Sequence, residues 1–176
     1  MNKYWKISGL QLALAFFLCT SAEAQESIKL SDAEVASVAV AANQIDIDYA
    51  AIAAKRSKNA EVLQFAETMA RDHKGVNAQA AALVKKLGVT PKDNAVSKQL
   101  LADAEKTRQM LKSKSGKDFV KAYIDNEVAY HKAVISAVET LLIPETEHAE
   151  LRELLQNVVP ALKAHLEHAE MLQKKH

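Results

Sequence analysis

The stretch AEVLQFAETMARDHKGVNAQAAALVKKLG, residues 60–88, decides the fold of this chain. Its apolar side chains recur at intervals of three and four residues, the spacing of one buried face on an α-helix. They are Val62, Phe65, Met69, Val76, Ala80, Leu83 and Leu87. His73 stands on the same face, where another apolar residue would be the usual choice. The stretch therefore predicts a long helix that buries an imidazole.

Two later stretches place a histidine in the same kind of position. His131 stands among Ile124, Glu127, Ile135, Val138 and Leu142, and His165 stands among Leu155, Val158, Leu162, Ala169 and Leu172. A buried imidazole needs a partner for each ring nitrogen. Three such rings in one core predict a polar cluster inside the fold.

The residues before the first stretch predict that it forms an antiparallel pair with another helix. Ser31 and Glu34 make a capping-box sequence, so a helix is expected from there to about Ser57. A tight connection then leads into the helix of residues 60–87. Gly88 ends that second helix, because glycine adopts the left-handed conformation of a helix C-terminus.

The second half of the chain predicts three more helices. A shorter, more polar helix is expected over 95–113, and another from Gly116 to about Leu142, where Pro144 should end it. The last is expected over about 146–173, with Pro160 inside it.

The helix at 95–113 is long enough to connect opposite ends of a bundle. Nineteen residues rise about 28 Å in an α-helix. We therefore predict an all-α fold, a ferritin-like four-helix bundle with a short extra helix in the crossover between its two hairpins. The alternative is simple up-down-up-down topology, with the extra helix covering one end.

Residues 1–24 are predicted to be a cleaved signal peptide. Two lysines precede an apolar stretch too short to span a bilayer, and Ala22 and Ala24 are the small residues that a signal peptidase reads. Cleavage after Ala24 would make the protein periplasmic or secreted and leave 25–176 as a single domain. It would also remove Cys19, the only cysteine, so no disulfide is expected.

The charge balance limits the kinds of partner. The formal net charge is +1, and the predicted signal peptide takes two lysines and one glutamate with it. A nearly neutral chain without a basic face is not expected to bind nucleic acid. No second hydrophobic stretch could span a membrane. We expect a monomer or weak dimer, with an envelope protein as the partner if it has one.

The candidate site is a layer across the middle of the bundle. In the crossover topology Asp46, His73 and His131 lie at similar heights along the bundle axis. Glu127 is one helical turn from His131. His165 is offset along the axis by up to two turns, unless a kink at Pro160 shifts it. Asp48 is two residues from Asp46 and points elsewhere. Imidazoles with one or two carboxylates suit zinc, iron, copper or manganese and do not suit calcium or magnesium.

A di-iron oxidase would need Glu-x-x-His on two helices. Ala70, Val128 and Leu162 stand where those glutamates would be, so a non-catalytic role is favoured. A metal-free alternative is a closed hydrogen-bond network completed by Tyr49, Tyr123 or Tyr130, and a small-ligand cavity is a third. Asp72 could orient a neighbouring ring. The remaining histidines, His148, His168 and His176, are expected to be solvated.

Several segments together resemble the DUF4142 family. They are Val62-Leu63-Gln64-Phe65-Ala66 leading to Met69 and Asp72-His73; Ser115-Gly116 leading to Phe119 and Tyr123; His131; and Val159-Pro160-Ala161-Leu162 followed by His165-Leu166. The resemblance covers about residues 30–172. It implies an exported ferritin-like four-helix bundle without a settled activity. The family often has glutamate where this chain has Asp46, and an acidic residue where it has Val120.

Two functions remain open from the sequence. The first is an exported bundle that binds a transition metal through Asp46, His73, Glu127, His131 and His165, for storage, buffering or stress protection. The second is a non-catalytic envelope domain, structural or stress-related, whose histidines only organise the core. A redox enzyme on bound iron is less supported, because the carboxylates are few.

Overall fold

The computed structural model describes residues 29–176, which are helical almost throughout and contain no strand. The elements are α1 (Asp32–Arg56), α2 (Ala60–Leu87), α3 (Ala95–Ser113), α4 (Gly116–Ala137), the π-helical turn η1 (Val138–Leu142), α5 (Ile143–Glu145) and α6 (Ala149–Lys175). The all-α prediction is confirmed. The predicted signal peptide, residues 1–24, lies outside the described residues.

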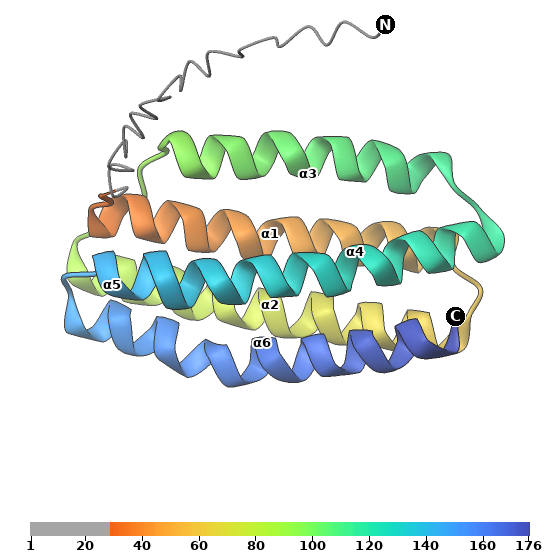
Figure 1. Ribbon diagram of the computed structural model, residues 1–176. Coiled ribbons are helices and arrows are strands. Elements are labelled where there is room, and N and C mark those ends of the chain that lie inside the picture. Colours follow the sequence, from red (N-terminus) through yellow and green to blue (C-terminus); the bar gives the residue numbers. More distant parts are fainter. Residues whose placement is uncertain (1–28) are drawn as a thin grey trace, which may run out of the picture.

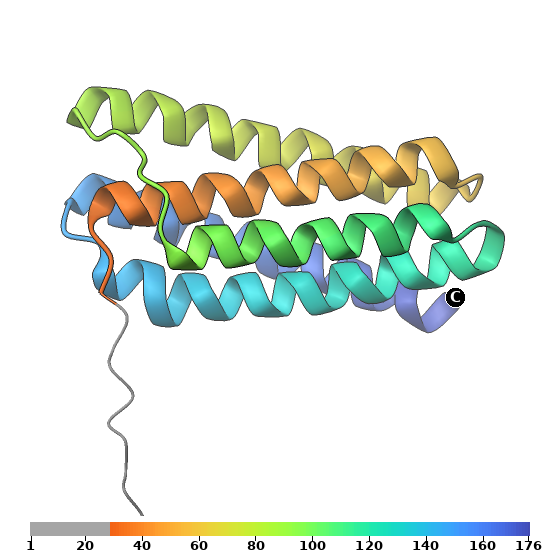
Figure 2. The same ribbon diagram turned by 90° about the horizontal axis from the view of Figure 1, so that it is seen from above.

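The four long helices form two antiparallel pairs, α1 with α2 and α4 with α6 (Figures 1 and 2). Helix α3 lies beside α1 and carries the chain back along the length of the bundle, so α2 and α4 run in the same direction. The crossover prediction is confirmed, and the simple up-and-down alternative is wrong.

Local signals account for the ends of the first three helices. The Glu34 carboxylate accepts the backbone N–H of Ser31 at 3.0 Å, as the capping-box sequence predicts. Gly88 ends α2 with φ at 68°, a conformation that glycine adopts without steric cost. The Asn94 side chain accepts the N–H of Ser97 at 3.0 Å and thereby caps α3.

The end of α4 differs from the prediction that Pro144 stops the helix near Leu142. The chain passes from α4 through η1 into α5 and stays helical to Glu145. In η1 the N–H of Ile143 bonds to the carbonyl of Val138, five residues back. Proline has no N–H and its ring clashes with the carbonyl of the preceding turn, and the wider π turn just before Pro144 accommodates both defects.

Helix α6 begins at Ala149, three residues later than predicted. The carboxylate of Asp32 accepts the backbone N–H groups of Glu147 and His148, at 2.8 and 3.0 Å. These bonds hold the residues before α6 against the start of α1. The helix then continues through Pro160 to Lys175 without interruption. No described helix is both long enough and apolar enough to cross a membrane.

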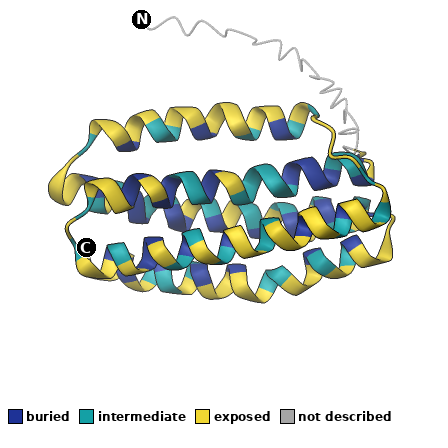
Figure 3. Ribbon diagram, turned by 180° about the vertical axis from the view of Figure 1, so that it is seen from behind, coloured by how far each residue is buried: buried dark blue, intermediate teal, exposed yellow. Residues whose placement is uncertain are grey.

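The core consists of two apolar groups, one toward each end of the bundle. Figure 3 shows buried positions facing inward on every long helix, with exposed positions outside. His131 lies between Val128 of one group and Ile135 of the other, and His165 lies between Ala169 and Leu162 in the same way. A polar layer therefore separates two apolar ones.

Candidate metal centre

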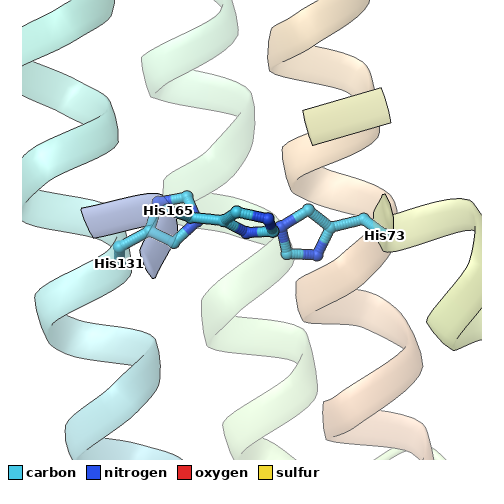
Figure 4. A group of neighbouring side chains, drawn as sticks. All are labelled: His73, His131 and His165. Atoms are coloured by element: carbon cyan, nitrogen blue, oxygen red, sulfur yellow. The ribbon is translucent and has the colours of Figure 1, made fainter. Parts of the chain in front are cut away.

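Three imidazole rings from different helices meet in this polar layer (Figure 4). His73 comes from α2, His131 from α4 and His165 from α6. Their ring centroids are 5.4 to 5.8 Å apart. One ring nitrogen of each histidine lies within 4.8 Å of one from each of the other two. The expected offset of His165 is wrong, because its ring stands as close to His73 and His131 as they do to each other.

The rings of His73 and His131 are each anchored at Nδ1 by an acceptor outside the cluster. Nδ1 of His73 lies 2.7 Å from Oδ1 of Asn43, and Nδ1 of His131 lies 3.0 Å from the backbone carbonyl of Glu127. A carbonyl oxygen only accepts, so both Nδ1 atoms carry the hydrogen. Neutral rings in this tautomer present a bare lone pair at Nε2.

His165 is held through its other ring nitrogen. Its Nε2 lies 3.0 Å from Oδ2 of Asp72, and its Nδ1 is buried without a hydrogen-bond partner. Burial would raise the pKa of Asp72, but hydrogen bonds from Arg71 and His165 outweigh burial and hold that pKa below its usual value. The expectation that Asp72 orients a neighbouring ring is confirmed. Burial lowers the pKa of His165, so its ring is neutral at pH 7.

Asp46 of α1 completes the cluster with a fully buried carboxylate. Its Oδ2 lies 3.1 Å from Nε2 of His73 and 3.4 Å from Nε2 of His131. Burial lowers the pKa of His131, which keeps that ring neutral. Nε2 of His131 therefore offers the carboxylate a lone pair and no hydrogen to donate. Such an arrangement calls for a cation or added protons at the centre.

A second carboxyl group adjoins the first. Asp46, Glu127 and His131 each offer one ligand atom, and these atoms lie within 4.8 Å of one another. Glu127 is fully buried. Burial, followed by the nearby Asp46 carboxylate, raises the pKa of Glu127 well above its usual value. Burial and the same two carboxyl groups also raise the pKa of Tyr123.

The tyrosines do not close a hydrogen-bond network around the rings. The Tyr130 hydroxyl donates to the carbonyl of Ala42 at 2.9 Å, and the buried Tyr123 hydroxyl lies against the Glu127 carboxyl group. No hydrogen bond within residues 29–176 joins a tyrosine hydroxyl to a histidine. Three ring nitrogens have no hydrogen-bond partner: Nε2 of His73, Nε2 of His131 and Nδ1 of His165. Both oxygens of Asp46 also lack one.

The remaining histidines lie outside the cluster. His148 and His176 are exposed, as predicted, although the His148 ring also bonds to the carboxylate of Asp32. The prediction for His168 is wrong, because its ring is half-buried and packs edge-on against Phe65, with centroids 5.1 Å apart.

Asn43 is the site residue that the sequence analysis missed. It stands three residues before Asp46 on α1, and residues three apart share a helix face. That spacing was the available signal, but an asparagine beside many alanines looks like an exposed position. Its side chain is half-buried and is also held by the Ala39 carbonyl, to which Nδ2 donates at 2.8 Å.

Comparison with known proteins gives one match. A family model described as "Domain of unknown function (DUF4142)" matches residues 18–172. A search of curated proteins and a search of solved structures each found no match. The matched range contains α1, α2 and α4, all but the last three residues of α6, and every residue of the cluster, as the resemblance implied. This chain belongs to the DUF4142 family.

Proposed function

We propose that the protein binds one transition-metal ion in the polar layer of the bundle. His73, His131 and His165 supply the nitrogen ligands, and Asp46 supplies a carboxylate oxygen. Glu127 offers a further carboxyl group close to Asp46 and His131. After export, the bound ion would serve storage, buffering or stress protection in the cell envelope.

The observation that carries this proposal is the convergence of unsatisfied acceptor atoms. Nε2 of His73, Nε2 of His131 and Nδ1 of His165 are buried without hydrogen-bond partners, and so is the Asp46 carboxylate. A divalent cation bound between the rings would give the three nitrogens a common partner beside the Asp46 carboxylate. The outer nitrogens are held by a side-chain amide, a backbone carbonyl and a carboxylate, the usual outer partners of metal-binding histidines.

The donor set favours a particular group of metals. Three imidazoles with a carboxylate suit zinc, iron, copper and manganese, whereas calcium and magnesium prefer oxygen ligands. Nitrogens bound tetrahedrally to zinc at about 2.0 Å are roughly 3.4 Å apart. The ring nitrogens lie within 4.8 Å of one another, so small movements would bring them into bonding range.

The test is metal content and zinc titration of the full chain. Protein exported in its native host should contain close to one equivalent of a transition metal by elemental analysis. Stripped protein should bind one equivalent of zinc by calorimetry. His73→Ala should abolish this binding, while His168→Ala should leave it unchanged, because His168 lies outside the cluster.

Protein that neither carries a metal nor binds added zinc, copper or iron would contradict the proposal. The envelope-domain alternative would then stand, with the histidines only organising the core. Oxygen consumption on adding ferrous iron would instead indicate a redox enzyme.

A further inference from the structure

A cavity of about 270 Å³ lies beside the histidine cluster in the interior of the bundle. Its walls are mostly apolar and come from all four long helices, from η1 and from the start of α3. Six of the side chains that shape it are Val38, Val84, Val138, Leu142, Leu155 and Leu162.

The cavity extends from the cluster toward one end of the molecule only. Its other lining residues precede Asp46 on α1 and, apart from Asp72, follow His73 on α2. Apart from Tyr130, they follow His131 on α4, and they precede His165 on α6. Given the helix directions in Figure 1, all these segments lead toward the end where α5 lies. From Asp46 to Ala36 the cavity accompanies α1 for about 15 Å at 1.5 Å per residue.

Polar groups line only one end of this space. They are Asn43, Asp46, Asp72, His73, His131 and His165, together with Tyr130, whose hydroxyl is already bonded to a carbonyl. A molecule that fits must therefore be elongated and apolar, with one small polar end at the histidines. A cavity of roughly 150 Å³ holds benzene, so about 270 Å³ corresponds to roughly ten carbon atoms.

We propose that this cavity binds a medium-chain carboxylic acid, with its alkyl chain along the apolar walls and its carboxylate at the histidine cluster. The choice of an anionic end rests on the proposed function. Three imidazoles and one carboxylate leave a divalent ion with net positive charge, and such an ion takes a further anionic ligand by expanding from four to five ligands. The volume leaves no room for a lipid with two chains.

The test uses the zinc-loaded full chain and a series of straight-chain acids measured by calorimetry. Each added methylene should tighten binding about fourfold from hexanoate to decanoate, since a buried methylene is worth about 0.8 kcal/mol. Tetradecanoate should gain nothing further, because the cavity is full. Decan-1-ol should bind equally with and without zinc, whereas decanoate should weaken at least tenfold when zinc is removed.

A matched pair of variants on α2 localises the binding. Ala80 is buried and lines the cavity, whereas Ala82 is exposed on the same helix. Ala80→Leu should weaken decanoate at least tenfold and leave hexanoate nearly unchanged, because the added carbons shorten the cavity. Ala82→Leu should bind the whole series like the unmodified protein.

The outcomes separate this proposal from the metal proposal. Stoichiometric zinc binding with no dependence on chain length, or equal effects of the two alanine variants, would overturn the cavity assignment and leave the metal site intact. Equal decanoate affinity with and without zinc would overturn the placement of the carboxylate. Binding to phosphatidylcholine vesicles without binding of free decanoate would overturn the choice of a free acid. Absence of zinc binding would overturn the metal proposal itself.

Discussion

At the scale of single residues, Asp46 is the most informative position. Its carboxylate faces Nε2 of His73 and of His131, both of which lack a hydrogen in the tautomers that their outer partners impose. An amide at this position would donate a hydrogen to one of these nitrogens. Asp46→Asn should therefore stabilise the metal-free protein by about 1 kcal/mol and raise its melting temperature by roughly 2 to 4 °C. The same change should weaken zinc binding.

Both effects can be read from thermal unfolding with and without zinc. Asp48→Asn is the matched control, since Asp48 lies on the same helix and pairs with Arg108 outside the cluster. If the inner ring nitrogens instead carried protons that bond to Asp46, the asparagine variant would be destabilised in the metal-free state. That result would contradict the tautomers assigned to His73 and His131.

Asn43 provides a second test because it holds a ring without touching the centre of the cluster. Asn43→Ala removes the 2.7 Å hydrogen bond to Nδ1 of His73 and frees the ring to turn. Loss of such an outer partner typically weakens metal affinity 10- to 100-fold. We expect a zinc affinity lowered by that factor with the stoichiometry still at one, measured by competition with a chelator.

Gln44→Ala is the control for this prediction. Gln44 is exposed on the same turn of α1 and bonds to Asp48. Zinc affinity that is unchanged in Asn43→Ala, or lowered equally in both variants, would show that the ring needs no support from Asn43.

Periodicity predicted the histidines and Asp46 because a helix face fixes which residues point inward. It could not predict their anchors. The carbonyl of Glu127 is a backbone group and leaves no mark in the sequence, and Asn43 resembles an ordinary surface residue. The depth of His165 was misjudged because counting turns along straight helices ignores how two helix pairs tilt and shift when they pack.

At the scale of the helices, alanine should have opposite effects at two glycines, Gly75 inside α2 and Gly88 directly after it. Gly75 lies inside the helix, and a methyl group there would meet nothing within 4 Å. Gly75→Ala should stabilise the protein by about 0.5 to 1 kcal/mol, because alanine loses less backbone entropy in a helix. Gly88 has φ at 68°. Gly88→Ala should cost about 1 to 2 kcal/mol, because a Cβ strains that conformation.

Urea unfolding of the two variants, each against the parent chain, measures both values. Each variant is the control for the other, since the substitution is the same and only the backbone conformation differs. Equal shifts in one direction would contradict the C-terminal role of Gly88.

The helix boundaries were well predicted where a local cap decides them and poorly where a distant contact does. Ser31 and Gly88 act through their own helices, and both boundaries agree with the structure. The start of α6 depends on Asp32, more than a hundred residues away in sequence. Before Pro144 the helix could either end or widen into a π turn, because either change accommodates a proline. The sequence does not decide between them.

At the scale of the whole molecule, the crossover was predictable and the cavity was not. The length of α3 matches that of a bundle, so its path along α1 follows from counting residues. A cavity depends on how side chains from several helices fill the space between them, and periodicity only says that those side chains face inward. Val138 and Leu155 looked like ordinary core residues in sequence, and the structure places both on the cavity wall.

At one end of the bundle, Asp32 joins the start of α1 to the start of α6. Its carboxylate accepts the N–H groups of Glu147 and His148 and bonds to the His148 ring. Burial would raise the pKa of Asp32, but these hydrogen bonds outweigh burial and hold the pKa below 3.8. A carboxyl group with a depressed pKa stabilises the fold above its unfolded-state pKa, and the contribution disappears as the pH falls through the folded-state value.

Asp32→Asn should therefore lower the unfolding free energy by about 1 to 2 kcal/mol at pH 7, because the amide accepts fewer bonds and carries no charge. The difference from the parent chain should shrink as the pH falls below about 4, since the parent then loses its carboxylate too. Urea unfolding of both chains from pH 3 to pH 7 measures this difference in unfolding free energy. Asp118→Asn, at an exposed position in the first turn of α4, should show a smaller and flatter difference. A deficit in Asp32→Asn that is constant over this range would mean that the carboxylate charge contributes nothing to joining the two helices.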